Sequence, residues 1–146
     1  MNLDASTDNF GPRIGYSGQV SDVLGIGGFF FRSRDPEALA DWYATRLGVG
    51  SGMSAPGVDI QPWSWGTTAG PVVFAPFPAD SDYFPADRAF MLNFRVGDLD
   101  AVLAPFRAAG EEIITNPDWD TPETGRFARV IDPEGNPVEL WEPPQG

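Results

Sequence analysis

The sequence predicts an α+β fold made of two βαβββ modules. A strand followed by a marked helix occurs twice in the same order, as "FFFRSRDPEALA" at 29–40 and "LNFRVGDLDAVL" at 92–103. A proline-anchored apolar strand then closes each half, as "GPVVFAPFP" at 70–78 and "NPVELWEPP" at 136–144. Because both ends of the unit repeat in register, we infer a duplicated module rather than two unrelated halves.

The domain organisation follows from local composition. Residues 1–22 are polar, contain glycine and lack periodicity, so we expect an arm whose order depends on docking. The first module is predicted at 23–80, an acidic linker at 81–87 and the second module at 88–146.

The first module begins with a strand candidate, "VLGIGGFFFRS" at 23–33. In the helix that follows, Asp35 is the expected N-cap, Pro36 the first helical residue and Gly48 the residue after the end. An apolar stripe predicts the face that packs on the core, formed by Leu39, Trp42, Tyr43 and Leu47.

The second module repeats this order with Asp98 in the place of the capping Asp35. Pro105 lies inside the predicted helix, where proline costs about 3 kcal/mol, so we expect a kink or a late start. The segment "DPEGN" at 132–136 predicts a tight turn with Gly135 at positive φ, between strands "GRFARVI" and "PVELWEP".

Composition limits the function classes. The 146 residues and 15.8 kDa suit one core, and 19 aromatic residues (11 Phe, 5 Trp, 3 Tyr) predict a generous core or an aromatic-lined pocket. The net charge of −12 repels phosphate backbones and anionic lipids, so we expect neither nucleic-acid nor membrane partners. No apolar run approaches the roughly 20 residues that span a bilayer, and a cytoplasmic location is expected.

Cysteine and histidine are both absent from the sequence. Their absence excludes disulfides, thiolate nucleophiles and the usual imidazole ligands and bases. Chemistry in this protein would therefore depend on carboxylates, hydroxyls and arginines.

Paired βαβββ modules, "DPEALADWYATRLG" at 35–48 and "DPEGNPVELWEP" at 132–143 resemble the vicinal oxygen chelate superfamily of glyoxalases, bleomycin-resistance proteins and extradiol dioxygenases. The resemblance covers 23–143 and is most specific in the terminal motif. It implies a curved, eight-stranded, mixed and mainly antiparallel sheet with the helices outside and an open central cup. It also implies a homodimer.

In that family four cup-facing positions hold His or Glu and bind a divalent metal. The resemblance assigns these positions here to Gly28, Val73, Met91 and Glu139. Three of the four residues are neither His nor Glu, so we expect no metal, no other cofactor and no glyoxalase I or dioxygenase chemistry. The alternative is an oxygen-only site in which Asp59, Asp118 or Asp120 joins Glu139.

Strand alternation and the family pattern predict which side chains share the cup with Glu139, the candidate catalytic residue. The candidate ligand-binding residues are Phe30, Arg32, Trp63, Trp65, Met91, Asn93, Arg95 and Trp141. The opposite phase should pack beneath the helices, through Phe29, Phe31, Val72, Phe74, Leu92, Phe94, Val138 and Leu140.

Each candidate also has a structural interpretation. Glu139 can be a buried acid held by Arg95 or Asn93, and the tryptophans can be packing or interface residues. Arg32 and Arg95 can be strand-end surface residues. These alternatives stay open at the level of sequence.

Three functions remain compatible with the sequence. The first is a metal-independent small-molecule binding protein of the bleomycin-resistance type, whose aromatic cups hold a planar or cationic ligand. The second is a glyoxalase-like lyase or isomerase with Glu139 as general base and Asn93 or an arginine polarising a carbonyl. The third is a subunit without a small-molecule function, which a filled apolar cup would indicate.

Overall fold

The computed structural model describes residues 23–50 and 65–145. These residues form an α+β arrangement with one mixed, open sheet of four strands in the order β1-β4-β3-β2. The elements are α1 (Pro36–Leu47), β1 (Leu92–Arg95), α2 (Leu99–Ala108), β2 (Ile113–Ile114), a 3₁₀ turn (Pro117–Trp119), β3 (Arg126–Ile131) and β4 (Pro137–Glu142). No helix in the described part of the chain is long and apolar enough to cross a membrane.

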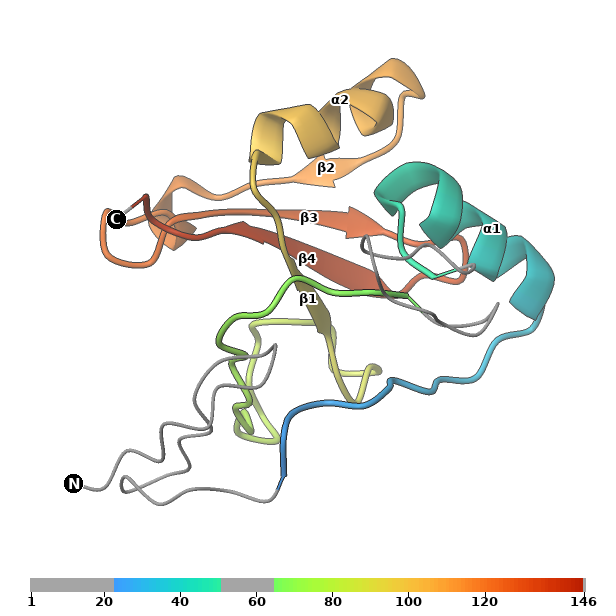
Figure 1. Cartoon of the computed structure of the whole chain (residues 1–146), viewed down its shortest axis with the longest axis horizontal. Helices are drawn as coiled ribbons and strands as arrows, with labels where there is room; N and C mark the ends of the chain where they lie inside the picture. The colour runs from blue at the N-terminus through green and yellow to red at the C-terminus, as the bar shows by residue number, and fades with distance from the viewer. Residues whose placement is uncertain (1–22, 51–64, 146) are drawn as a thin grey trace.

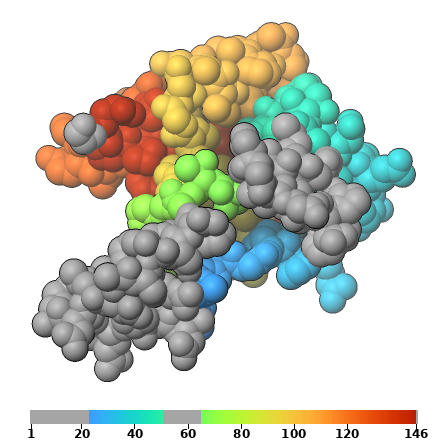
Figure 2. Space-filling view, in the orientation of Figure 1, coloured from blue at the N-terminus to red at the C-terminus, as the bar shows by residue number. Residues whose placement is uncertain are grey.

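All four strands come from the second predicted module, which has the expected βαβββ order. β1 pairs in parallel with β4, while β2–β3 and β3–β4 are antiparallel. Both helices lie on one side of the sheet (Figure 1). In the space-filling view α1 and α2 lie next to each other (Figure 2).

The expectation of eight strands is not met by the described residues. Residues 23–35 and 65–80 follow extended paths but form no ladder, and a strand exists only where a neighbour pairs its backbone groups. The middle of the first predicted module, 51–64, lies outside the described residues. The first half of the chain therefore contributes one helix, α1, to the described fold.

Helix α1 confirms the predicted start and stop signals. The Asp35 carboxylate accepts from the Ala38 backbone N–H at 3.1 Å, Pro36 occupies the first turn, and Gly48 ends the helix with φ 66°. Of the predicted apolar stripe, Leu39 and Tyr43 are buried, and Trp42 and Leu47 are partly buried against the core.

Of the two outcomes expected from Pro105, a kink or a late start, the late start is wrong for helix α2. It begins at Leu99, directly after Asp98, whose carboxylate accepts from the Ala101 backbone N–H at 3.0 Å. Pro105 lies inside this helix, so the cap and the buried face outweigh the missing hydrogen bond.

The core lies between the helices and one face of β3 and β4. Each strand presents alternate residues to that core, as the period of two requires. Its buried members are Leu39, Tyr43, Leu99, Leu103, Phe106, Ala128, Val130, Val138 and Leu140. Of the residues predicted beneath the helices, Val138 and Leu140 are buried there. The prediction is wrong for Val72 and Phe74, which are exposed because no neighbouring strand of the described chain pairs with their segment.

The turn at 132–136 fastens distant parts of the chain to this core. Asp132 is buried, and its Oδ1 accepts from the backbone N–H groups of Glu134 and Asn136, both at 2.9 Å. Its Oδ2 accepts from the Tyr43 hydroxyl and from Asn136 Nδ2, both at 2.8 Å. Gly135 has φ 82°, as the turn prediction required.

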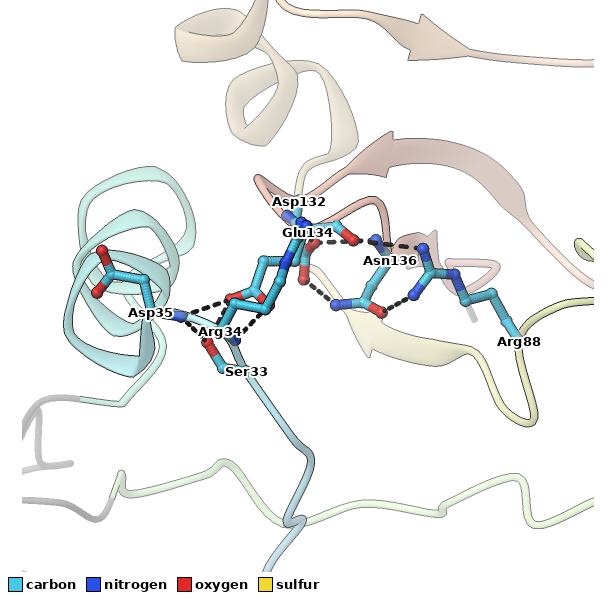
Figure 3. Close-up of polar contacts among 7 residues, drawn as sticks. All are labelled: Ser33, Arg34, Asp35, Arg88, Asp132, Glu134 and Asn136. Atoms are coloured by element: carbon cyan, nitrogen blue, oxygen red, sulfur yellow. Dashed lines mark hydrogen bonds and ion pairs between the residues drawn. The ribbon is translucent and has the colours of Figure 1, made fainter.

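Two further side chains, Glu134 and Arg88, extend this network to the segments before α1 and before β1 (Figure 3). The Glu134 carboxylate accepts from the Ser33 hydroxyl and from the Arg34 backbone N–H at 2.7 Å, just before α1. These hydrogen bonds, led by the one from Ser33, lower the pKa of Glu134. Arg88 donates to Asn136 Oδ1 at 3.1 Å, so the turn also holds the segment that enters β1.

Replacing Tyr43 with Phe tests this network. The change removes one hydrogen bond to a buried carboxylate and keeps the ring in the core, so the free energy of unfolding should fall by about 1–3 kcal/mol. Urea denaturation followed by circular dichroism measures the loss. Thr45→Ala, at an exposed position of the same helix, is the control and should change stability by less than about 0.5 kcal/mol. If Tyr43→Phe lowers the free energy of unfolding no more than the control does, the hydrogen bond from Tyr43 to Asp132 does not stabilise the fold as described.

Candidate functional site

The face of the sheet that turns away from the helices carries charged and polar side chains. Arg129 and Glu139 lie directly opposite each other on β3 and β4, and Asn93 lies opposite Glu139 on β1. Arg129 is 7% exposed and Glu139 is 4% exposed. The predicted phase of β4 is therefore confirmed, because its neighbours Val138 and Leu140 face the core.

The Glu139 carboxylate is hydrogen-bonded at both oxygens. Oε1 accepts from Asn93 Nδ2 at 2.8 Å, and Oε2 accepts from the Tyr83 hydroxyl at 2.7 Å. Arg129 Nε lies 3.7 Å from Oε2, which is an ion-pair distance but too long for a hydrogen bond. A buried charge is thus neutralised by one cation and held by two neutral donors.

The Arg129 guanidinium is placed mainly by aromatic rings. Its central carbon lies over the Tyr83 ring at 4.5 Å and over the Trp119 ring at 4.7 Å. Because the planes of these two rings are inclined at 62°, the guanidinium sits at the corner between them rather than between parallel faces. Arg129 Nε and Nη2 are buried and have no hydrogen-bond partner in the described part of the chain.

Tyr83 connects this cluster to the surface. Burial, followed by the hydrogen bond to Glu139, raises the pKa of its hydroxyl, so the group stays protonated and donates at neutral pH. An open hollow of about 480 Å³ lies beside it, lined by Asp80, Ser81, Asp82, Tyr83, Phe84, Pro85, Ala86 and Arg129. The cluster therefore has access from solvent on the side of residues 80–86.

Among the predicted ligand-binding residues within 23–50 and 65–145, only Asn93 makes a hydrogen bond to Glu139. Trp141 on β4 pairs with Arg95 on β1 and with Phe127 on β3. Its ring stacks on that of Phe127 with the centroids 6.2 Å apart, and its Nε1 donates to the Thr124 carbonyl at 2.6 Å. Arg95 is exposed and donates to the carbonyls of Thr68 and Pro71, at 2.8 and 3.3 Å. Both therefore make structural contacts, and their contact with a ligand stays a prediction.

The remaining candidates lie apart from the Glu139 cluster or outside the described residues. Phe30 is 90% exposed and Arg32 is also exposed. Trp65 contacts Phe94, a residue of the opposite phase, with ring centroids 5.9 Å apart. Met91 is half-buried just before β1. Trp63 lies outside the described residues.

Sequence analysis missed Arg129, Tyr83 and Trp119. The first could have been found, because a turn at 132–136 fixes the hairpin register and puts Arg129 opposite Glu139. Tyr83 and Trp119 lie in irregular segments without periodicity, so no pattern in the sequence indicated their positions.

The residues present do not fit the divalent metal that the superfamily commonly holds. In residues 23–50 and 65–145, no three Asp, Glu, His or Cys side chains are grouped to hold a metal ion. The positions assigned to ligands are Gly28, Val73 and Met91, which offer no suitable donor. Glu139 already has a guanidinium beside it, and that charge would repel a divalent cation.

A family model described as a glyoxalase-like domain matches residues 28–141. Two solved structures from Streptomyces sp. CB03234 are similar. One is TnmS3, an antibiotic binding protein, with 29% identity, a TM-score of 0.46, and coverage of 75% of this chain and 87% of that chain. The other is a glyoxalase/bleomycin resistance protein, with 28% identity, a TM-score of 0.45, and coverage of 74% and 91%. No curated protein matches the chain.

Replacing Glu139 with Gln tests the ion pair. The variant leaves the Arg129 charge buried without a counter-charge, so the free energy of unfolding should fall by about 3 kcal/mol. The double variant Arg129→Gln/Glu139→Gln removes both charges and should recover at least half of that loss, measured by urea denaturation.

The matched control is Glu111→Gln, which removes one partner of the half-exposed Arg46–Glu111 pair on the helix side. It should cost about 1 kcal/mol or less. If Glu139→Gln costs no more than Glu111→Gln, the buried pair does not contribute as described.

Proposed function

Because the chain belongs to the glyoxalase-like domain family of the vicinal oxygen chelate superfamily, we propose that it is a metal-independent small-molecule binding protein of the bleomycin-resistance type. The ligand lies against the non-helical face of the sheet, over Arg129 and Glu139. One observation carries the proposal. Arg129, one member of a buried ion pair, lines an open hollow whose wall also holds the aromatic residues Tyr83 and Phe84.

The charged cluster argues against a purely structural subunit. Burying two charges costs several kcal/mol each before their attraction is counted, and apolar residues of similar size would often be as stable. A filled apolar face, which the third hypothesis required, is not what Arg129, Glu139 and Asn93 provide. A binding role gives these polar groups a purpose beyond folding.

Binding is favoured over catalysis by the state of Glu139. A general base needs a lone pair directed at the substrate proton. Both oxygens of Glu139 already accept hydrogen bonds, from Asn93 and Tyr83, and Arg129 stabilises the negative charge. The lyase or isomerase hypothesis therefore requires that substrate displace at least one of these donors.

The finer details of the fold also belong to this proposal. We expect the first half of the chain to complete the eight-stranded sheet and cup when two copies of the chain associate. Large apolar side chains are strongly exposed in two segments of that half, at 74% for Val73, 89% for Phe74 and 90% for Phe30. Exposed apolar side chains at this density are typical of an interface. The proposed partner is a second copy, in a homodimer.

A screen for bound aromatic compounds tests the binding function. Native mass spectrometry with a set of naphthalene-sized aromatic compounds should detect 1:1 complexes, and Trp119→Ala should weaken the hits about tenfold, because Trp119 is one of the two rings that hold the Arg129 guanidinium at the hollow. Glu111→Gln, on the helix side, is the control and should leave their affinity unchanged. Hits that bind Trp119→Ala as well as the natural sequence would place the site elsewhere.

The assembly is tested by sedimentation velocity. At micromolar concentration the chain should sediment as a species of twice its 15.8 kDa mass. Phe74→Ser, in the exposed apolar segment, should shift the equilibrium towards the monomer without unfolding α1 or α2. Sedimentation of the natural sequence at 15.8 kDa alone would overturn the dimer.

A further inference from the structure

Arg129 has hydrogen-bonding capacity that the protein does not use. Its Nε and Nη2 are buried without a partner among the described residues, although each N–H that is buried and unpaired costs free energy. The same side chain lines the open hollow beside Tyr83. A ligand that enters the hollow lies against Arg129, whose Nη2 is buried beneath that surface without a partner in residues 23–50 and 65–145, while Nε faces Glu139.

The charge of Arg129, unlike its donors, is already balanced. Glu139 lies at ion-pair distance from Nε, 3.7 Å away. Two further carboxylates, Asp80 and Asp82, line the hollow, and the whole chain carries a net charge of −12. An anionic ligand would gain one hydrogen-bonding partner but face three carboxylates, so a neutral acceptor fits this site better.

The surroundings of the guanidinium define the shape of that acceptor. Tyr83 and Trp119 occupy two sides of it, and Phe84 adds another aromatic residue to the wall of the hollow. Flat apolar walls around a planar donor favour a flat ligand whose oxygen lies in its ring plane.

We infer that the ligand is a neutral, planar aromatic compound with a carbonyl oxygen, and that Arg129 donates hydrogen bonds to that oxygen. The inference rests on the proposed binding function and names its ligand class. The composition predicted a planar or cationic ligand. The inference keeps the planar ligand and excludes the cationic one, because a guanidinium donor binds an acceptor. It also gives Glu139 the part of holding Arg129, as a positioning residue.

Three matched naphthalenes test the inference by ligand-observed NMR titration. The probes are 2-acetonaphthone, which has the carbonyl; 2-ethylnaphthalene, which lacks it; and 2-naphthoate, which is anionic. The ketone should bind about tenfold more tightly than 2-ethylnaphthalene, as expected for a hydrogen bond to a charged donor. It should also bind more tightly than 2-naphthoate.

The variant Arg129→Gln/Glu139→Gln removes the donor and its counter-charge together. The advantage of the ketone over 2-ethylnaphthalene should fall to less than about twofold, because the donor to the carbonyl oxygen is then absent. Circular dichroism checks that the double variant is folded.

A second measurement uses the natural sequence and does not depend on a variant. The carbonyl ¹³C resonance of labelled 2-acetonaphthone should move downfield on binding, because a carbonyl that accepts from a guanidinium is polarised. An unshifted resonance in the bound ketone would overturn the inference.

The outcomes separate the inference from the function on which it rests. If the ketone and 2-ethylnaphthalene bind equally, the chain binds aromatic molecules but the assigned role of Arg129 is wrong. Tighter binding of 2-naphthoate would replace the neutral ligand class with an anionic one and so overturn the inference. If none of the three binds, the proposed binding function fails with it.

Discussion

The buried carboxylate of Asp132 is the constraint on which the described structure depends. It closes the turn between β3 and β4, and it receives the Tyr43 hydroxyl from α1 on the same oxygen that accepts from Asn136. Burial, followed by this hydrogen bond, raises the pKa of Tyr43, which therefore remains a donor throughout the physiological range. One side chain thus fixes both the hairpin and the helix that packs on it.

The consequence of this turn extends to the other face of the sheet. Because the turn sets the hairpin register, Arg129 lies opposite Glu139, and both point away from the helices. The parallel pairing of β1 with β4 then adds Asn93 to the same row. The side chains of the "DPEGN" motif therefore stabilise the fold. The motif affects the candidate site only by setting the register of the β3–β4 hairpin.

An ion pair lies on the face of the sheet that carries Glu139, the position that the superfamily pattern assigns to a metal ligand. A guanidinium is a cation that carries its own hydrogen-bond donors, so it can orient an oxygen of a ligand without any coordination chemistry. It does not lower the pKa of a bound water as a divalent metal does, and this difference favours recognition over hydrolysis or isomerisation. The same fold can therefore carry a site with different chemistry.

The sequence alone determined α1, the capped start of α2, the 132–136 turn and the phase of β4. These features depend on neighbours in the chain. Asp35 and Asp98 each cap a helix by accepting from the backbone N–H three residues later. The alternation of a strand places Glu139 on the face opposite Val138 and Leu140. The tertiary structure decided what surrounds Glu139. Tyr83 and Trp119 come from irregular segments, and their distance to Arg129 depends on how the chain returns across the sheet, which no local periodicity encodes. The described residues of the first half form no strand for the same reason, since a strand needs a partner that lies far away in sequence or on a second copy of the chain.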